Sequence, residues 1–229
     1  MRKYVIAVDG YAATGKSTTA KLVADFLGYT FIDTGAMYRA VTYYMQQRNI
    51  AISAENPEFQ EALKDVVIDF RPDPECGDLV LFMNGINVDM PIRSMEVNAE
   101  VSEVAAISEV RRRLVALQRE MGKGGGVVMD GRDIGTVVFP QADLKFFLIA
   151  DMEVRVVRRI AQLAKKGKVA HPDEVRENLA HRDHIDSSRE DSPLRKAADA
   201  VEIDTSDMTI PMQTELIVKM VKELDRQEA

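Results

Sequence analysis

The sequence predicts an α/β protein with a parallel sheet, because strand-like and helix-like segments alternate from the N-terminus. Residues 4–9 (YVIAVD) are short, apolar and β-branched, which predicts a buried strand. Residues 16–27 carry apolar side chains at helical spacing and are followed by Gly28, a residue suited to end a helix. Residues 30–33 again predict a strand, and residues 36–48 a helix. This order favours parallel strands joined by crossover helices.

The middle of the chain predicts a small antiparallel insert. Segments 66–70, 79–83 and 86–88 are strand-like, and the dipeptide Asn84-Gly85 separates the last two. Such a dipeptide favours a two-residue hairpin, because a type I′ turn needs a positive φ at both positions. We therefore expect antiparallel strands over about residues 62–93.

The rest of the chain returns to the α/β pattern. Residues 95–121 are helical in composition, and Ser108 is a candidate cap for a second helix inside this stretch. After the break at 124–126 (GGG), the sequence predicts strands at 127–130 and 144–150, polar helices at 151–167 and 172–188, a strand at 200–204 and a helix at 210–226. No internal repeat is visible.

Composition excludes several classes of protein. The 229 residues have a net charge of −7, which disfavours a protein that coats nucleic acid. A single cysteine excludes an intrachain disulfide, and no apolar stretch approaches the length of a membrane span. We expect a cytoplasmic protein that binds neither nucleic acid nor membrane, and we expect a monomer.

Residues 10–17 match G-x-x-x-x-G-K-[ST], with a predicted strand before the motif and a predicted helix after it. Backbone N–H groups of such a loop form an anion nest at the helix N-terminus. Lys16 would reach the β- and γ-phosphates of a nucleotide, and Ser17 would bind Mg²⁺. The residues expected to contact ATP are Gly10, Tyr11, Ala12, Ala13, Thr14, Gly15, Lys16, Ser17 and Thr18, although a threonine in the place of Thr18 more often merely begins a helix. The motif defines a nucleoside triphosphate site but not the reaction.

Two further motifs follow predicted strands. They are residues 33–39 (DTGAMYR) and 130–136 (DGRDIGT), and each brings a carboxylate, a glycine and an arginine to a strand end. Ligands of open α/β sheets bind at the carboxyl ends of the strands. Asp130 is placed to orient Mg²⁺, although an aspartate in this position can also simply cap a helix.

Arginines gather in the two polar helices. Arg155, Arg158 and Arg159 are three to four residues apart, and Arg182, Asp186 and Arg189 also share one helical face. Guanidinium groups match phosphate oxygens and stabilise transition-state charge. A mobile helical lid would also exclude water from the reaction. The alternative is a solvated helix face with exposed ion pairs.

These motifs together resemble the bacterial cytidylate kinase family of P-loop nucleoside monophosphate kinases. The resemblance rests on residues 8–18, 33–39, 104–106, 130–140, 182–189 and 197–206 and so spans nearly the whole chain. It implies a three-layer P-loop kinase core with a parallel sheet, an antiparallel β insert in the monophosphate-binding region, and a helical lid. The implied division is a core of residues 1–61, 122–150 and 197–229, an insert region of about 62–121, and a lid of about 151–196.

The resemblance also implies roles for individual residues. Thr34 and Tyr38 would contact the acceptor, and its phosphate would be bound by Arg39, Arg132 and Arg189. The cytosine would be read by Ser102, Arg111 and Asp133, and the sugar by Arg182 and Asp186. Arg158 would contact ATP, and the catalytic residues would be Lys16, Arg132, Arg155 and Arg159. Ser17, Asp33 and Asp130 would organise the metal.

Two positions constrain this assignment geometrically. Ser102 and Arg111 are nine residues apart, so one straight helix would place them on opposite faces. Both can meet one base only if the chain bends, and we therefore predict a helix boundary at 106–109. The chain also departs from the family pattern: Tyr11 and Ala13 stand where proline and glycine are usual, and Ile185 where a polar or basic residue is common.

The resulting hypothesis is an enzyme that moves the γ-phosphate of ATP, with Mg²⁺, to CMP and dCMP. Three alternatives remain open at this stage. The acceptor could instead be UMP, AMP or shikimate, which only the acceptor motifs discriminate. A regulatory GTPase would need a guanine-reading N-K-x-D motif, which the sequence lacks. A binding protein without turnover is disfavoured by the intact Lys16 and Ser17.

Overall fold

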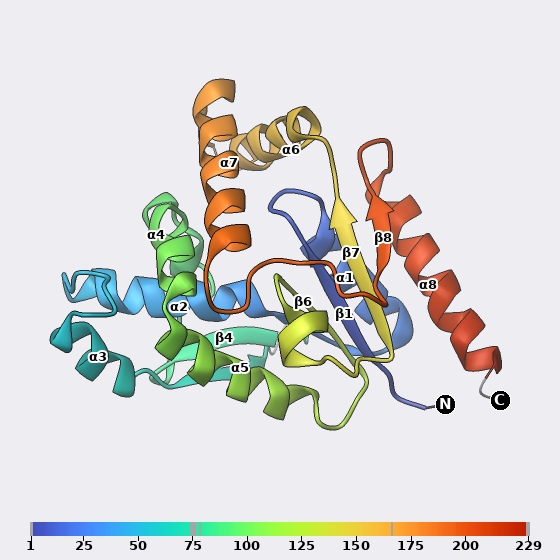
Figure 1. Ribbon diagram of the computed structural model, residues 1–229, viewed down its shortest axis with the longest axis horizontal. Helices are drawn as coiled ribbons and strands as arrows, with labels where there is room; N and C mark the ends of the chain where they lie inside the picture. The colour runs from blue at the N-terminus through green and yellow to red at the C-terminus, as the bar shows by residue number, and fades with distance from the viewer. Residues whose placement is uncertain (1, 74–76, 78, 166, 228–229) are drawn as a thin grey trace. The chain divides into compact units, whose positions relative to one another are not determined.

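The computed structural model describes residues 2–73, 77, 79–165 and 167–227 and is shown in Figure 1. The chain forms two compact units, one of Met1–Ile32 with Met121–Ala229 and one of Asp33–Glu120.

The first unit holds the long sheet. Its elements are β1 (Val5–Gly10), α1 (Lys16–Leu27), β2 (Thr30–Asp33), β6 (Val127–Gly131), the short helix η2 (Ile134–Val138), β7 (Leu144–Ile149), α6 (Met152–Ala164), α7 (Pro172–Ser188), β8 (Val201–Asp204) and α8 (Ile210–Gln227). The strand order is β2-β6-β1-β7-β8, and the pairs β6–β1, β1–β7 and β7–β8 are parallel. The parallel sheet predicted from the sequence is therefore confirmed. Its register places Asp130 beside Val8, close to the end of β1.

Two helices bury the apolar side of this sheet. In α1, Ala20 and Val23 are fully buried, and in α8, Ile217 is fully buried and Val221 nearly so. These side chains share one cluster with strand residues such as Ile6. Since α1 and α8 also contact each other, the helix that follows the phosphate-binding loop is held on two sides.

The second unit is built on a helix and a small sheet. Its elements are α2 (Thr34–Gln47), α3 (Pro57–Lys64), β3 (Ile68–Pro72), β4 (Leu79–Met83), β5 (Ile86–Asn87), the 3₁₀ helix η1 (Pro91–Arg93), α4 (Met95–Ala106) and α5 (Ser108–Gly122), whose last residues pass into the first unit. The sheet order is β3-β4-β5 with antiparallel pairing. Asn84 and Gly85 have φ values of 50° and 79°, so the antiparallel insert and the positive φ expected at its hairpin are confirmed.

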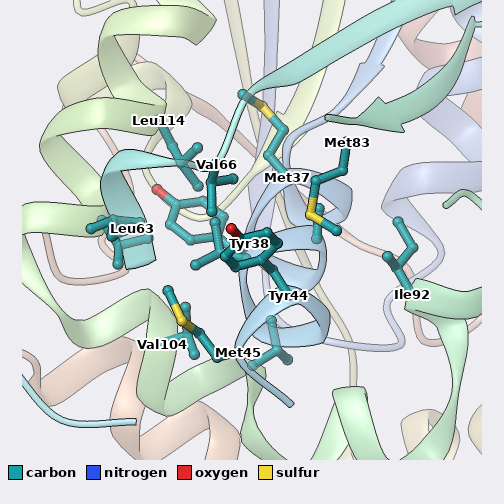
Figure 2. Close-up of a cluster of buried hydrophobic side chains, with 14 of the residues drawn as sticks. Met37, Tyr38, Tyr44, Met45, Leu63, Val66, Met83, Ile92, Val104 and Leu114 are labelled. Carbon is teal, nitrogen blue, oxygen red and sulfur yellow. The ribbon is translucent and has the colours of Figure 1, made fainter. Parts of the chain in front are cut away.

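The core of the second unit surrounds α2. Figure 2 shows Met37, Tyr38, Tyr44 and Met45 of this helix among side chains from the other elements. The partners include Leu63 of α3, Met83 of β4, Ile92 of η1, Val104 of α4 and Leu114 of α5. The helix begins where the Asp33 side chain accepts a hydrogen bond from Ala36 N at 3.0 Å, a standard N-terminal cap.

The predicted helix boundary at 106–109 is confirmed. Helix α4 ends at Ala106, Ile107 adopts an extended conformation with ψ of 116°, and α5 begins at Ser108. Three elements were not predicted. Helix α3 begins at Pro57 with Asn56 as its cap, η1 is a 3₁₀ turn, and η2 is a π-helical turn in which Phe139 N donates to Ile134 O at 2.7 Å. The first insert strand begins at Ile68, two residues later than predicted.

Within the described ranges, no helix combines the length and the apolar character that crossing a bilayer requires.

Candidate active site

The loop between β1 and α1 has the geometry of a phosphate cradle. Gly10 has a φ of 144°, and a Cβ at this position would lie 2.1 Å from Leu148 O, so only glycine fits. Gly15 has a φ of 98° and precedes Lys16, where α1 begins. No side chain caps this helix within the part of the chain that the structure describes, so the N–H groups of its first turn face the loop. Such a turn binds anions.

Lys16 lies inside this loop with little exposure. Its Nζ donates a hydrogen bond to Tyr11 O at 3.0 Å, and the residue is only 6% exposed. Burial, and then the neighbouring charge of Arg132, lowers the pKa of the Lys16 ammonium to about 7. Bound phosphates would reverse this effect, because an opposite charge stabilises the ammonium.

Ser17 and Asp130 lie together, as the sequence predicted for a metal site. Ser17 Oγ donates a hydrogen bond to Asp130 Oδ2, because β6 lies directly beside β1. A hydroxyl and a carboxylate next to a phosphate cradle form the set of hard oxygen ligands that suits Mg²⁺. These two residues therefore fit the metal that the motif implies.

One loop residue departs from ordinary backbone geometry. Ala13 has a φ of 62°, a left-handed conformation that glycine adopts more easily. The family pattern has glycine here, so the loop keeps the conformation without the residue that favours it. The neighbouring Tyr11 ring makes an edge contact with Phe147, their centroids 6.1 Å apart.

The three arginines of α6 occupy different environments. Arg155 is 6% exposed, and its Nη1 lies 2.7 Å from Asp183 Oδ2 of α7. Its guanidinium carbon is 5.3 Å from the centroid of the Tyr11 ring. Arg159 Nη1 donates to Gln162 Oε1 of the same helix at 2.6 Å.

Arg158 joins the loop to the segment after β8. Its guanidinium donates to Thr14 O at 3.2 Å, Thr205 Oγ1 at 3.1 Å, Thr205 O at 2.5 Å and Met208 O at 3.2 Å. Thr205 Oγ1 itself lies 2.9 Å from Thr14 O. All four acceptors belong to the protein, so Arg158 secures the shape of the loop in this structure. Thr205 and Asp183 were assigned no role from the sequence, because their partners are distant in the chain.

The predicted acceptor residues of the first unit converge on Asp186. Arg132 Nε donates to Asp186 Oδ2 at 2.7 Å, and Arg189 Nη1 lies 3.8 Å from Asp186 Oδ1. Arg189 Nη2 also lies 3.8 Å from Asp133 Oδ1. Burial opposes the charge on Asp186, but Arg132, then Arg189 and Arg182, hold the pKa of its carboxyl below the ordinary value. The structure thus brings Arg132, Asp133, Arg182, Asp186 and Arg189 together as one charged cluster.

The acceptor residues of the second unit form a separate group. Asp33 Oδ2 lies 2.6 Å from Arg39 Nη2 and 3.6 Å from Arg93 Nη1, while Oδ1 caps α2. Arg39 Nε is buried and makes no hydrogen bond to any described residue. Arg93, which the sequence analysis did not single out, also lies 3.1 Å from Asp89.

Three of the residues expected to read the base or contact the acceptor are buried in the second unit. Thr34 and Ser102 are 2% and 4% exposed, and Arg111 is 2% exposed. Arg111 Nη1 donates to Ala105 O at 3.2 Å, which is possible because the chain bends before Ser108. Its guanidinium carbon lies 5.7 Å from the centroid of the Tyr38 ring.

The phosphate cradle on a parallel sheet, with the Ser17–Asp130 pair beside it, defines a P-loop protein that binds nucleoside triphosphates. The family of the chain is also shown, because the sequence model of the cytidylate kinase family matches residues 6–223, nearly the whole length. The chain belongs to the cytidylate kinase family and is a kinase, which implies the use of ATP.

Individual relatives agree with this assignment. The chain is 52% identical over 215 residues to a protein named cytidylate kinase from Parabacteroides distasonis, covering 93% of this chain and 94% of the relative. It is 48% identical over 221 residues to one from Cytophaga hutchinsonii, covering 96% and 94%. An uncharacterized protein from Eubacterium ventriosum has a similar fold, with a TM-score of 0.52, 11% identity, and coverage of 97% of this chain and 99% of that chain. The family and the names of the relatives support phosphorylation of CMP and dCMP with ATP.

Proposed function

We propose that this protein transfers the γ-phosphate of Mg·ATP to CMP and dCMP, giving CDP or dCDP and ADP. Apart from the family, one observation carries the proposal. Gly131, directly before Arg132, pairs with Asp9, directly before the phosphate cradle, so the segment with this arginine begins beside the cradle. Burial lowers the pKa of Lys16, and the charges of Arg132 and Arg182 lower it further, in agreement with this proximity. A cradle for one phosphate chain and a cluster of arginines for a second phosphate are what phosphoryl transfer between two nucleotides requires.

On the ATP side, we propose that the backbone of residues 10–17 and Lys16 bind the β- and γ-phosphates. Ser17 and Asp130 would hold Mg²⁺, which would neutralise the charge of the phosphates. Asp33 fits the metal role less well, because one oxygen caps α2 and the other pairs with Arg39. The magnesium site that we propose therefore consists of Ser17 and Asp130.

On the acceptor side, we propose that Arg39, Arg132 and Arg189 orient the phosphate of CMP for in-line attack. Arg132 and Arg189 are already held by Asp186, which reduces the entropy lost when the acceptor binds. Further acceptor contacts would come from Thr34 and Tyr38, base contacts from Ser102, Arg111 and Asp133, and sugar contacts from Arg182 and Asp186.

The chemical step itself needs little from the protein. The nucleophile is a phosphate oxygen that is already ionised near neutral pH, so no general base is required. We propose that Arg155 and Arg159, within a lid of residues 151–196, stabilise charge on the transferring group and help to exclude water. Arg155 Nε is buried without a hydrogen bond among the described residues, which leaves a donor for a phosphate oxygen.

Product analysis tests this proposal directly. With ATP labelled at the γ-phosphate, Mg²⁺ and CMP, the label should appear as the β-phosphate of CDP. Label found only as inorganic phosphate would mean that water is the acceptor and would contradict the proposal. We also propose that the protein acts as a monomer in the cytoplasm, and light scattering on the purified protein would test its oligomeric state.

A further inference from the structure

Asp9 is a buried carboxylate to which the proposed mechanism gives no role. It is the second-last residue of β1, directly before Gly10, and only 4% of it is exposed. Its Oδ1 accepts a hydrogen bond from Ile134 N at 2.8 Å, and its Oδ2 accepts one from Gly135 N at 2.7 Å. These two N–H groups belong to the first turn of η2, which follows Arg132 and Asp133.

A helix N-terminus normally takes its cap from the residue that precedes it. In η2 that residue is Asp133, but its side chain makes no capping hydrogen bond. The carboxylate of Asp9, on the neighbouring strand, takes that place and satisfies two N–H groups at once. Asp133 Oδ1 instead lies 3.8 Å from Arg189 Nη2, inside the acceptor cluster.

We propose that Asp9 is a positioning residue, which caps η2 in place of Asp133 and so holds Asp133 and Arg132 toward the acceptor nucleotide. This inference rests on the proposed function, in which these two residues bind CMP. In this proposal, Asp9 connects β1, which leads into the phosphate loop, with the segment that carries Arg132 and Asp133.

Two features support the assignment. Burial raises the pKa of Asp9 to about 7 even though both N–H groups lower it, so the carboxylate is kept in a place that is unfavourable for its charge. Gly135 also lies against the carboxylate, because a Cβ there would meet Asp9 Oδ2 at 3.4 Å, an ordinary van der Waals contact, and Lys145 Cδ at 3.1 Å. The carboxylate and the backbone of η2 are thus in direct contact.

The phosphate loop has its own support, which gives the proposal a specific signature. Gly10 pairs with Leu148 of β7, and Arg158 and Thr205 secure Thr14. Loss of the Asp9 contacts should therefore disturb acceptor binding much more than ATP binding. If the Asp9 contacts served stability alone, their loss would not change KM for one substrate more than KM for the other.

The test compares Asp9→Asn with a matched control, Asp143→Asn. Asp143 also accepts a backbone N–H, that of Val5 at 2.8 Å, but at the opposite end of β1. In Asp9→Asn, one of the two N–H groups would face an amide NH₂ and lose its acceptor. We expect KM for CMP to rise by about tenfold or more, the effect of a lost hydrogen bond to a charged group, with KM for ATP changed by less than about threefold. Asp143→Asn should leave both KM values near those of the unaltered protein.

A second variant alters the same segment without removing the carboxylate. Gly135→Ala leaves Asp9 in place, because the added methyl would meet Asp9 Oδ2 at an ordinary 3.4 Å and would press mainly on Lys145 Cδ at 3.1 Å, so both KM values should stay near those of the unaltered protein. Equal changes in both KM values, or none in either, for Asp9→Asn would overturn the inference, and so would a rise in KM for CMP in Gly135→Ala as large as that in Asp9→Asn. If the unaltered protein did not phosphorylate CMP at all, the proposed function would fail instead, so the two failures are distinguishable.

Discussion

The buried Lys16 makes ATP binding depend on pH in a calculable way. Lys16 has a pKa of about 7 in the absence of nucleotide, so at pH 8 only about one lysine in ten carries a charge. ATP favours the charged form, because the phosphates return the pKa toward its ordinary value. Binding at pH 8 should therefore take up about 0.9 proton for each ATP. The affinity should fall about fivefold between pH 7 and 8 and about tenfold between pH 8 and 9.

Isothermal titration calorimetry measures both quantities. ATP would be titrated at pH 8 and 9 in buffers of different ionisation enthalpy, with EDTA present to exclude metal, and the dependence of the heat on the buffer gives the number of protons. Lys16→Arg is the matched control, since a guanidinium stays charged over this range, and its affinity should be nearly independent of pH. Constant affinity from pH 8 to 9 with no proton uptake in the unaltered protein would refute the reasoning about Lys16.

Three further substitutions test the site. Asp186→Ala removes the partner of Arg132 and Arg189, so in steady-state assays KM should rise by about tenfold for both CMP and dCMP, and discrimination between them should weaken; unchanged KM values for both would contradict its role. Arg158→Lys cannot maintain all four hydrogen bonds to the loop and the segment after β8. KM for ATP should therefore rise by several-fold, and the free energy of unfolding in urea should fall by about 1–3 kcal/mol. The control Arg176→Lys, which alters an exposed ion pair, should change both quantities little. Ala13→Gly removes the strain of a left-handed alanine, which costs about 1 kcal/mol, but it also stabilises the unfolded chain by about 0.4–1 kcal/mol through greater conformational entropy. The free energy of unfolding measured by calorimetry should therefore change by less than about 1 kcal/mol, and a larger change would contradict this balance.

The sequence predicted the elements whose cause is local. The phosphate loop depends on glycines at defined spacing and the hairpin on Asn84-Gly85. The break between α4 and α5 was predicted indirectly, from the expectation that Ser102 and Arg111 contact one base. Helix α3 also had a local signal, Asn56 followed by Pro57, which the prediction did not use.

The contacts that secure the site could not be predicted in the same way. Asp9 caps a helix more than a hundred residues later in the chain, and Arg158 donates to backbone oxygens of residues in two distant loops. Backbone acceptors carry no side-chain signature, so sequence alone does not identify them as partners. Asp33 illustrates the same limit, since its position after a strand suggested a metal site, and its contacts with Arg39 and Ala36 appear only in the structure.

The most direct test of the central claim is ADP production from Mg·ATP by the purified protein with CMP, dCMP, UMP, AMP, GMP or shikimate as acceptor. The account predicts strong turnover with CMP and dCMP and little with the purine nucleotides or shikimate. Lys16→Met should lower kcat by orders of magnitude in the same assay. Preferred turnover of another acceptor would contradict the roles of Ser102, Arg111 and Asp133 in reading cytosine, and the absence of any acceptor-dependent ADP production would contradict the assignment as a CMP kinase.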